Sequence, residues 1–138
     1  MFGVPLHPLV VHFPIALSIL AAIYDLRAYS SNRPELHVTG YRLTLWAAAG
    51  ALVAVASGLQ FMGGVGFDNS RTAAHAGAGL IAGISATALA ILRYSAHVRH
   101  PQSKASYPVT WLVLEVFAAV AVAVAAIIGH RLGYFPGV

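Results

Sequence analysis

The amino-acid sequence predicts an all-α membrane protein, an antiparallel bundle of four transmembrane helices that forms one domain over residues 1–138. Three observations lead to this class. Charged residues make up only 9% of the chain and hydrophobic residues 59%, and the mean hydropathy is +0.76. Four apolar stretches approach the roughly 20 residues that span a hydrocarbon core. A water-soluble domain with so few charged groups could not cover its surface with polar atoms.

The four membrane helices are expected at residues 8–26, 41–62, 73–94 and 109–128. No Lys or Arg precedes the first stretch, so we expect a mature helix there and not a signal peptide. Polar and turn-forming residues separate the helices at residues 27–40, 63–72 and 95–108. Because these joints are short, consecutive helices are expected to lie antiparallel to each other.

The basic residues predict how the bundle is oriented in the membrane. Six of the eight flank the first and third joints: Arg27, Arg33, Arg42, Arg93, Arg99 and Lys104. Only Arg71 and Arg131 lie on the other side. Cytoplasmic loops carry an excess of Lys and Arg, so this distribution places the first and third joints in the cytoplasm. Both chain termini would then face the periplasm or the cell exterior.

The composition also excludes several kinds of chemistry. The chain has no cysteine, which excludes disulfides, thiolate metal sites, iron–sulfur clusters and covalently attached c-type haem. The net charge of +4 is spread over the joints without a dense basic tract, so nucleic acid is not an expected partner. No nucleophile elbow, phosphate loop or zinc-protease motif is present. A redox cofactor, if one is bound, must be held by histidine.

The seven histidines divide into two groups under this topology. Odd-numbered helices start where even-numbered helices end, so four histidines are expected near the outer membrane face: His7, His12, His75 and His130. Three more fall in the cytoplasmic joints: His37, His97 and His100. Imidazole inside a bilayer needs a polar partner, and it is also the commonest metal ligand in proteins. The outer group is therefore the candidate site.

A b-type haem is the cofactor that this outer group fits best. His12 and His75 are the expected axial ligands, because they lie on two parallel helices that can sit diagonally across the bundle. The same two histidines are the candidates for a non-haem metal. His7 and His130 are secondary candidates. Other residues could complete the haem site by leaving space for the ring (Gly58, Gly77, Gly79 and Gly83) or by pairing with the propionates (Arg71 and Arg131).

Each of these residues also has a purely structural interpretation. Gly79 and Gly83 form a G-x-x-x-G pattern, which usually serves close helix packing. Arginines at helix ends commonly reach the lipid headgroups. The histidines could hydrogen-bond across helices, contact the interface or be solvated.

Two acidic residues also need partners. Glu115 lies about 10 Å into the last helix, where Arg42, Arg93 or a neighbouring subunit could pair with it, and a proton or quinone role is the alternative. Asp25 is expected to form an interfacial charge cluster with Arg27.

The segment from His7 to Leu17 reads His-Pro-Leu-Val-Val-His-Phe-Pro-Ile-Ala-Leu. It resembles the opening motif of the domain-of-unknown-function 2231 family of small bacterial membrane proteins. Looser similarity continues at residues 57–59, 71–80 and 134–138. The resemblance implies four membrane helices in a bacterial inner membrane, and its histidine-rich pattern implies haem or metal binding. Related tails often carry a histidine before the final Gly-Val, where this chain has Pro136.

The functional expectation is a redox-type subunit of a membrane complex. It would bind a b-type haem near the outer face and relay electrons between the quinone pool and an external redox partner. Its partners would be the lipid bilayer and other membrane or periplasmic redox subunits. One alternative is a cofactor-free structural or assembly subunit, and another is a non-haem metal-binding membrane protein. An electron-transfer or accessory subunit fits better than an enzyme acting alone.

Overall fold

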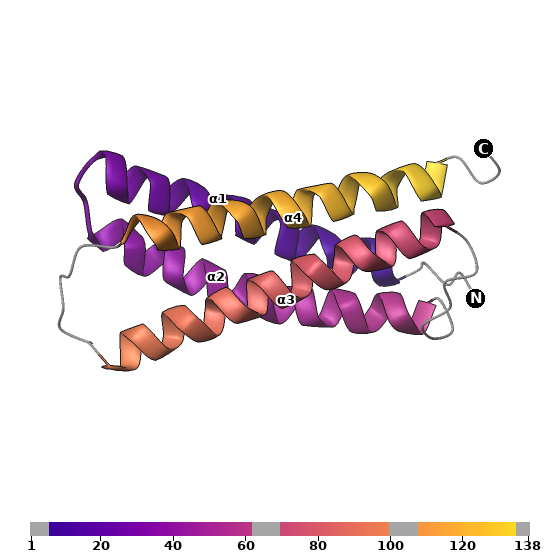
Figure 1. Ribbon diagram of the computed structural model, residues 1–138, viewed down its shortest axis with the longest axis horizontal. Coiled ribbons are helices and arrows are strands. Elements are labelled where there is room, and N and C mark those ends of the chain that lie inside the picture. The colour runs from indigo at the N-terminus through magenta and orange to yellow at the C-terminus, as the bar shows by residue number, and fades with distance from the viewer. Residues whose placement is uncertain (1–5, 62–69, 100–107, 135–138) are drawn as a thin grey trace.

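Four helices make up the computed structural model, which describes residues 6–61, 70–99 and 108–134. They are α1 (Leu6–Ser30), α2 (Glu35–Phe61), α3 (Ser70–Arg99) and α4 (Val109–Tyr134). Figure 1 shows them lying alongside one another on a common long axis, with consecutive helices running in opposite directions. Each of the four is long and apolar enough to cross a membrane. The all-α membrane class predicted from the sequence is confirmed.

Every described helix extends beyond the apolar stretch that predicted it. Residues 27–40 were expected to be a joint, but α1 continues to Ser30 and α2 already begins at Glu35. An apolar window marks only the part of a helix inside the hydrocarbon core, whereas polar turns can continue into the interface. His37 and His97 therefore lie within α2 and α3 and not in joints.

The turn between α1 and α2 has a defined end. Asn32 adopts a left-handed conformation with φ of 51°, and the Arg33 N–H donates to the Ala28 carbonyl at 3.0 Å. Both are features of a helix that closes on a left-handed residue. Pro34 precedes the first residue of α2 and cannot continue α1. This tight turn fixes how the end of α1 faces the start of α2.

The helices pack in a ring in which α1 contacts α2 and α4, and α3 also contacts α2 and α4. The interior is lined with small side chains. Ala48 and Ala51 of α2 meet Ala86 and Ala90 of α3, and Ala82 of α3 packs against the last helix through Val122 and Ala125. Small residues let helix backbones approach closely in lipid.

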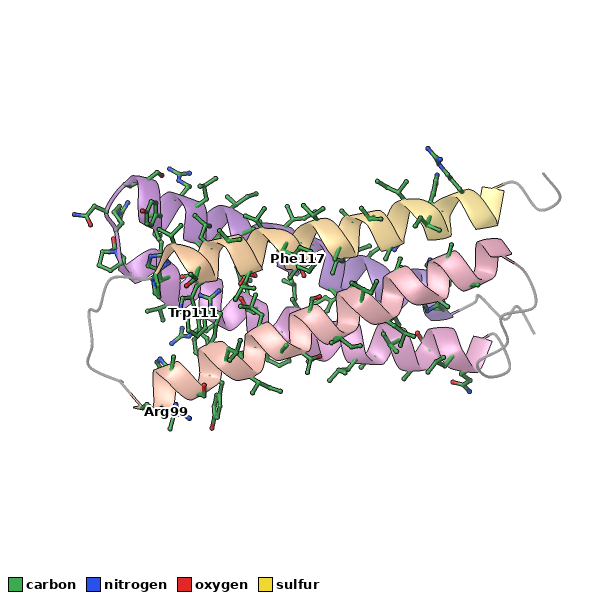
Figure 2. The ribbon with its side chains drawn as sticks, in the orientation of Figure 1. Arg99, Trp111 and Phe117 are labelled. Atoms are coloured by element: carbon green, nitrogen blue, oxygen red, sulfur yellow. The ribbon has the colours of Figure 1, made fainter. Side chains whose placement is uncertain are left out.

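Large apolar side chains point outward, the reverse of a water-soluble protein. Trp46 is 64% exposed and Ile84 67% exposed. Phe117 on α4 is another example, and Figure 2 shows that the outward side chains along the middle of the bundle are mostly hydrocarbon. Such a surface would be unfavourable in water, but lipid tails are as apolar as these side chains. The packing pattern thus agrees with a bundle surrounded by lipid.

Candidate functional site

Within the part of the chain that the structure describes, two clusters of polar groups lie inside the bundle, one near each end. The first, called the histidine site here, comprises His7, Ser57, His75 and the carbonyl of Ala125. The rings of His7 on α1 and His75 on α3 are 6.1 Å apart between centroids, at an interplanar angle of 72°. His7 Nδ1 lies 3.0 Å from Ser57 Oγ on α2, and His75 Nδ1 lies 3.1 Å from the Ala125 carbonyl on α4. All four helices therefore contribute to it.

The hydrogen bonds determine which nitrogen of each imidazole carries a proton. A carbonyl oxygen only accepts, so His75 Nδ1 must donate to Ala125. The Ser57 hydroxyl donates its single hydrogen to the Ala54 carbonyl at 2.9 Å, so Ser57 Oγ accepts a hydrogen bond from His7 Nδ1. Both rings thus carry hydrogen on Nδ1, and in the neutral form the lone pair is on Nε2. This is the tautomer of a histidine that binds a metal through Nε2 and is oriented by a second-shell oxygen.

Glycines hold these rings against the neighbouring helices. A β-carbon added at Gly58 would lie 2.9 Å from His7 Cε1, and one added at Gly129 would lie 2.5 Å from His75 Cε1. Gly58 was expected to make room for a haem ring, but the space beside it is taken by the His7 imidazole. Gly129 was missed by the sequence interpretation. By contrast, nothing lies within 4 Å of a β-carbon added at Gly77 or Gly79.

The other predicted site residues lie differently. The His12 side chain is exposed, and its Nδ1 is 2.6 Å from the Pro8 carbonyl of the same helix. His130 and Arg131 are exposed near the end of α4. The Arg71 side chain lies outside the described part of the chain. Gly83 serves packing, since a β-carbon there would be 2.9 Å from Val55 Cγ2. The structure therefore favours His7 over His12 as the partner of His75.

The second cluster, called the charged cluster here, lies where α1 and α3 end and α2 and α4 begin. Its members are Asp25, His37, Thr44, Arg93 and Glu115, and all but His37 are at most 3% exposed. Arg93 Nη1 lies 2.6 Å from Asp25 Oδ2 and 2.8 Å from Glu115 Oε2. Arg93 Nη2 lies 3.2 Å from Asp25 Oδ1. One guanidinium thus joins carboxylates from α1 and α4.

His37 and Thr44 of α2 complete the charged cluster. His37 Nδ1 is 3.0 Å from Asp25 Oδ1, and the His37 carbonyl accepts from Arg93 Nη2 at 3.2 Å. Thr44 Oγ1 lies 3.0 Å from Glu115 Oε2 and 2.9 Å from Arg93 Nη1. Charges buried in a membrane are costly unless paired and hydrogen-bonded, and here every charged member has such contacts.

The aromatic and backbone surroundings hold the cluster in place. The Tyr41 ring stacks on His97 with centroids 4.8 Å apart and lies 5.9 Å from the Arg93 guanidinium carbon. A β-carbon added at Gly40 would overlap the Asp25 carboxylate. The carboxylate therefore rests directly on the backbone of α2.

The sequence predicted part of this cluster. Of the three partners considered for Glu115, the structure selects Arg93. The expected interfacial pairing of Asp25 with Arg27 was wrong, because Asp25 is fully buried and pairs with Arg93. The sequence gives little sign that Asp25 is buried, because α1 is apolar nearly all round and its inward face cannot be read from local composition.

Comparison with known proteins adds one positive result. A family model described as "Predicted membrane protein (DUF2231)" matches residues 3–138, which is nearly the whole chain. No curated protein and no solved structure matches the chain.

Proposed function

We propose that this chain, which belongs to the DUF2231 family of predicted membrane proteins, is a redox-type integral membrane subunit. In this proposal it holds a b-type haem near the outer membrane face and relays electrons between the quinone pool and an external redox partner. The observation that carries the proposal is the pair formed by His7 and His75 inside the bundle.

The donor set suits a haem with two axial ligands. Both imidazoles present Nε2 as the lone-pair nitrogen when neutral, and each is oriented by an oxygen acceptor. The two rings lie 6.1 Å apart between centroids, so His7 and His75 are the residues that would hold the haem iron. Gly79, one turn after His75, has open space beside it. When bound, the haem would supply one-electron transfer.

The position of the pair fits the proposed role. His7 lies at the start of α1 and His75 near the start of α3, the end of the bundle at which the basic residues predict an outer location. Arg131, exposed near the same end, remains a candidate partner for the propionates, together with Arg71. A chain of this size would act with other membrane or periplasmic subunits.

Haem content tests this proposal directly. The protein is expressed with ample haem supply and purified in detergent, and haem is quantified by pyridine haemochromogen together with metal analysis. We expect about one b haem per chain, with a low-spin spectrum lost in His75→Ala. The matched control is His97→Ala, which changes a histidine at the opposite end of α3 and should keep the spectrum. Absence of haem from the wild-type protein would reject the proposal.

A cofactor-free structural or assembly subunit is the second candidate. It is favoured by a specific observation: the contact of His7 with Ser57 joins α1 to α2, and the contact of His75 with Ala125 joins α3 to α4. In that case the wild-type protein would contain no haem, and His75→Ala would lower its thermal stability.

A non-haem metal site has less geometric support. Within the described ranges, no three side chains of His, Cys, Asp or Glu come together as a metal-binding group. Such a site would therefore need further ligands in addition to His7 and His75. Metal analysis of the haem-free protein distinguishes this alternative from the structural one.

A further inference from the structure

Hydrogen atoms are too few for the contacts around Glu115. Thr44 has one hydroxyl hydrogen, yet its Oγ1 lies 2.9 Å from the Gly40 carbonyl and 3.0 Å from Glu115 Oε2. The Gly40 carbonyl only accepts. If Thr44 donates to it, the short contact between the two side-chain oxygens needs a hydrogen from Glu115.

Arg93 cannot make up the difference. Its Nη1 carries two hydrogens but faces three oxygens, Asp25 Oδ2 at 2.6 Å, Glu115 Oε2 at 2.8 Å and Thr44 Oγ1 at 2.9 Å. Thr44 Oγ1 makes two further contacts, with the Gly40 carbonyl and with Glu115 Oε2. The five contacts together have only three hydrogens, two on Arg93 Nη1 and one on Thr44. A proton on Glu115 Oε2 would donate to Thr44 and let Thr44 donate to Gly40.

The charges lead to the same conclusion. Asp25 and Glu115 share the single guanidinium of Arg93, so the charged cluster carries one net negative charge when both carboxylates are ionised and His37, beside Asp25, is neutral. An uncompensated charge is costly inside a bilayer. One bound proton removes it. Asp25 receives Arg93 donors on both oxygens and also contacts His37, which keeps Asp25 the better-stabilised anion and leaves Glu115 as the proton acceptor.

We propose that the charged cluster is a proton-binding site in which Glu115 holds an exchangeable proton. The polar and titratable groups at this site besides Glu115 come from three helices. They are Asp25 from α1, Thr44, His37 and Tyr41 from α2, and Arg93 and His97 from α3. The His37 side chain is 15% exposed and is the most exposed member of the charged cluster. This site is independent of the haem proposal.

Infrared spectroscopy of the carboxyl groups tests the proposal. The chain contains only four Asp and Glu residues: Asp25, Glu35, Asp68 and Glu115. A protonated carboxyl has a C=O stretch that carboxylates lack and that shifts in deuterated water. At neutral pH we expect this band in the wild-type protein, loss of the band in Glu115→Gln, and its retention in Glu35→Gln. Glu35 is an exposed residue paired with Arg33.

A second variant keeps Glu115 in place. Thr44→Val removes the acceptor for the proposed Glu115 hydrogen, so the C=O stretch should move to higher frequency as that hydrogen bond is lost. A wild-type protein without the band, or a band that remains in Glu115→Gln and disappears in Asp25→Asn, would overturn the proposal. So would a band that Thr44→Val leaves unchanged.

Discussion

At the scale of single residues, glycines make room for the polar side chains inside the bundle. A β-carbon at Gly129 would lie 2.5 Å from His75 Cε1, and one at Gly40 would overlap the Asp25 carboxylate. In both places a side chain from one helix rests on the backbone of the next. The glycines therefore determine where the histidine site and the charged cluster can form.

Gly129→Ala is expected to destabilise the protein, because the added methyl group must displace the His75 ring and its bond to Ala125. Overpacking of this kind costs about 1–3 kcal/mol. The matched control is Gly77→Ala, where the β-carbon meets nothing within 4 Å and the better helix propensity of alanine can add up to about 1 kcal/mol. Thermal unfolding in detergent measures both. Equal or greater stability of Gly129→Ala would contradict the packing described for His75.

Arg93→Met is expected to lower the free energy of unfolding strongly. The change leaves the buried carboxyl groups of Asp25 and Glu115 without their shared guanidinium. Removal of one partner from a buried ion pair typically costs about 3–5 kcal/mol. Arg33→Met is the control, since Arg33 pairs with Glu35 on the exposed surface and its loss should have little effect. Chemical denaturation in mixed micelles gives both values, and similar losses would argue against a central role for Arg93.

At the scale of the helices, the sequence predicted where the chain crosses the membrane but not how each helix is rotated. Three of the four predicted apolar stretches lie within the observed helices, and the fourth, 41–62, overlaps α2 up to Phe61, because hydropathy depends on local composition. The facing direction was not readable in α1, which is apolar nearly all round. His7 and His12 are five residues apart and point roughly 140° from each other on an ideal helix, so only packing against α2 and α4 determines which one faces inward.

The turn between α1 and α2 gives a test at this scale. Asn32 is left-handed, a conformation that glycine and asparagine tolerate and that costs other residues about 1–2 kcal/mol. Asn32→Gly should therefore keep the melting temperature close to that of the wild type, whereas Asn32→Val should lower it. If the valine variant melts with the wild type, this turn does not constrain how α1 meets α2.

At the scale of the whole molecule, the two clusters lie at opposite ends of the helices, which run alongside one another (Figure 1). The class of the protein was predictable, because helices that face lipid need many apolar and few charged residues, and this bias is present along the entire chain. The charged cluster was only partly predictable, because it depends on contacts between residues as distant as Asp25 and Arg93. Such contacts follow from tertiary packing and leave little trace in local sequence.

Orientation in the membrane is open to a direct test, because the chain has no native cysteine. In whole cells, a membrane-impermeant maleimide should label Arg131→Cys from outside. Ser31→Cys, in the turn between α1 and α2, should be labelled only after the membrane is permeabilised. This pattern follows from the excess of basic residues near the charged cluster. The reverse pattern would place the histidine site on the cytoplasmic side.

The assignment of His7 and His75 as the ligand pair is tested by the reduced-minus-oxidised absorbance spectra of His7→Ala and His12→Ala. The two variants remove similar side chains from the same helix, but only His7 contacts His75. We predict that the low-spin b-haem spectrum is lost in His7→Ala and kept in His12→Ala, at equal protein and haem supply. Loss of the spectrum in His12→Ala, with its retention in His7→Ala, would contradict the assignment.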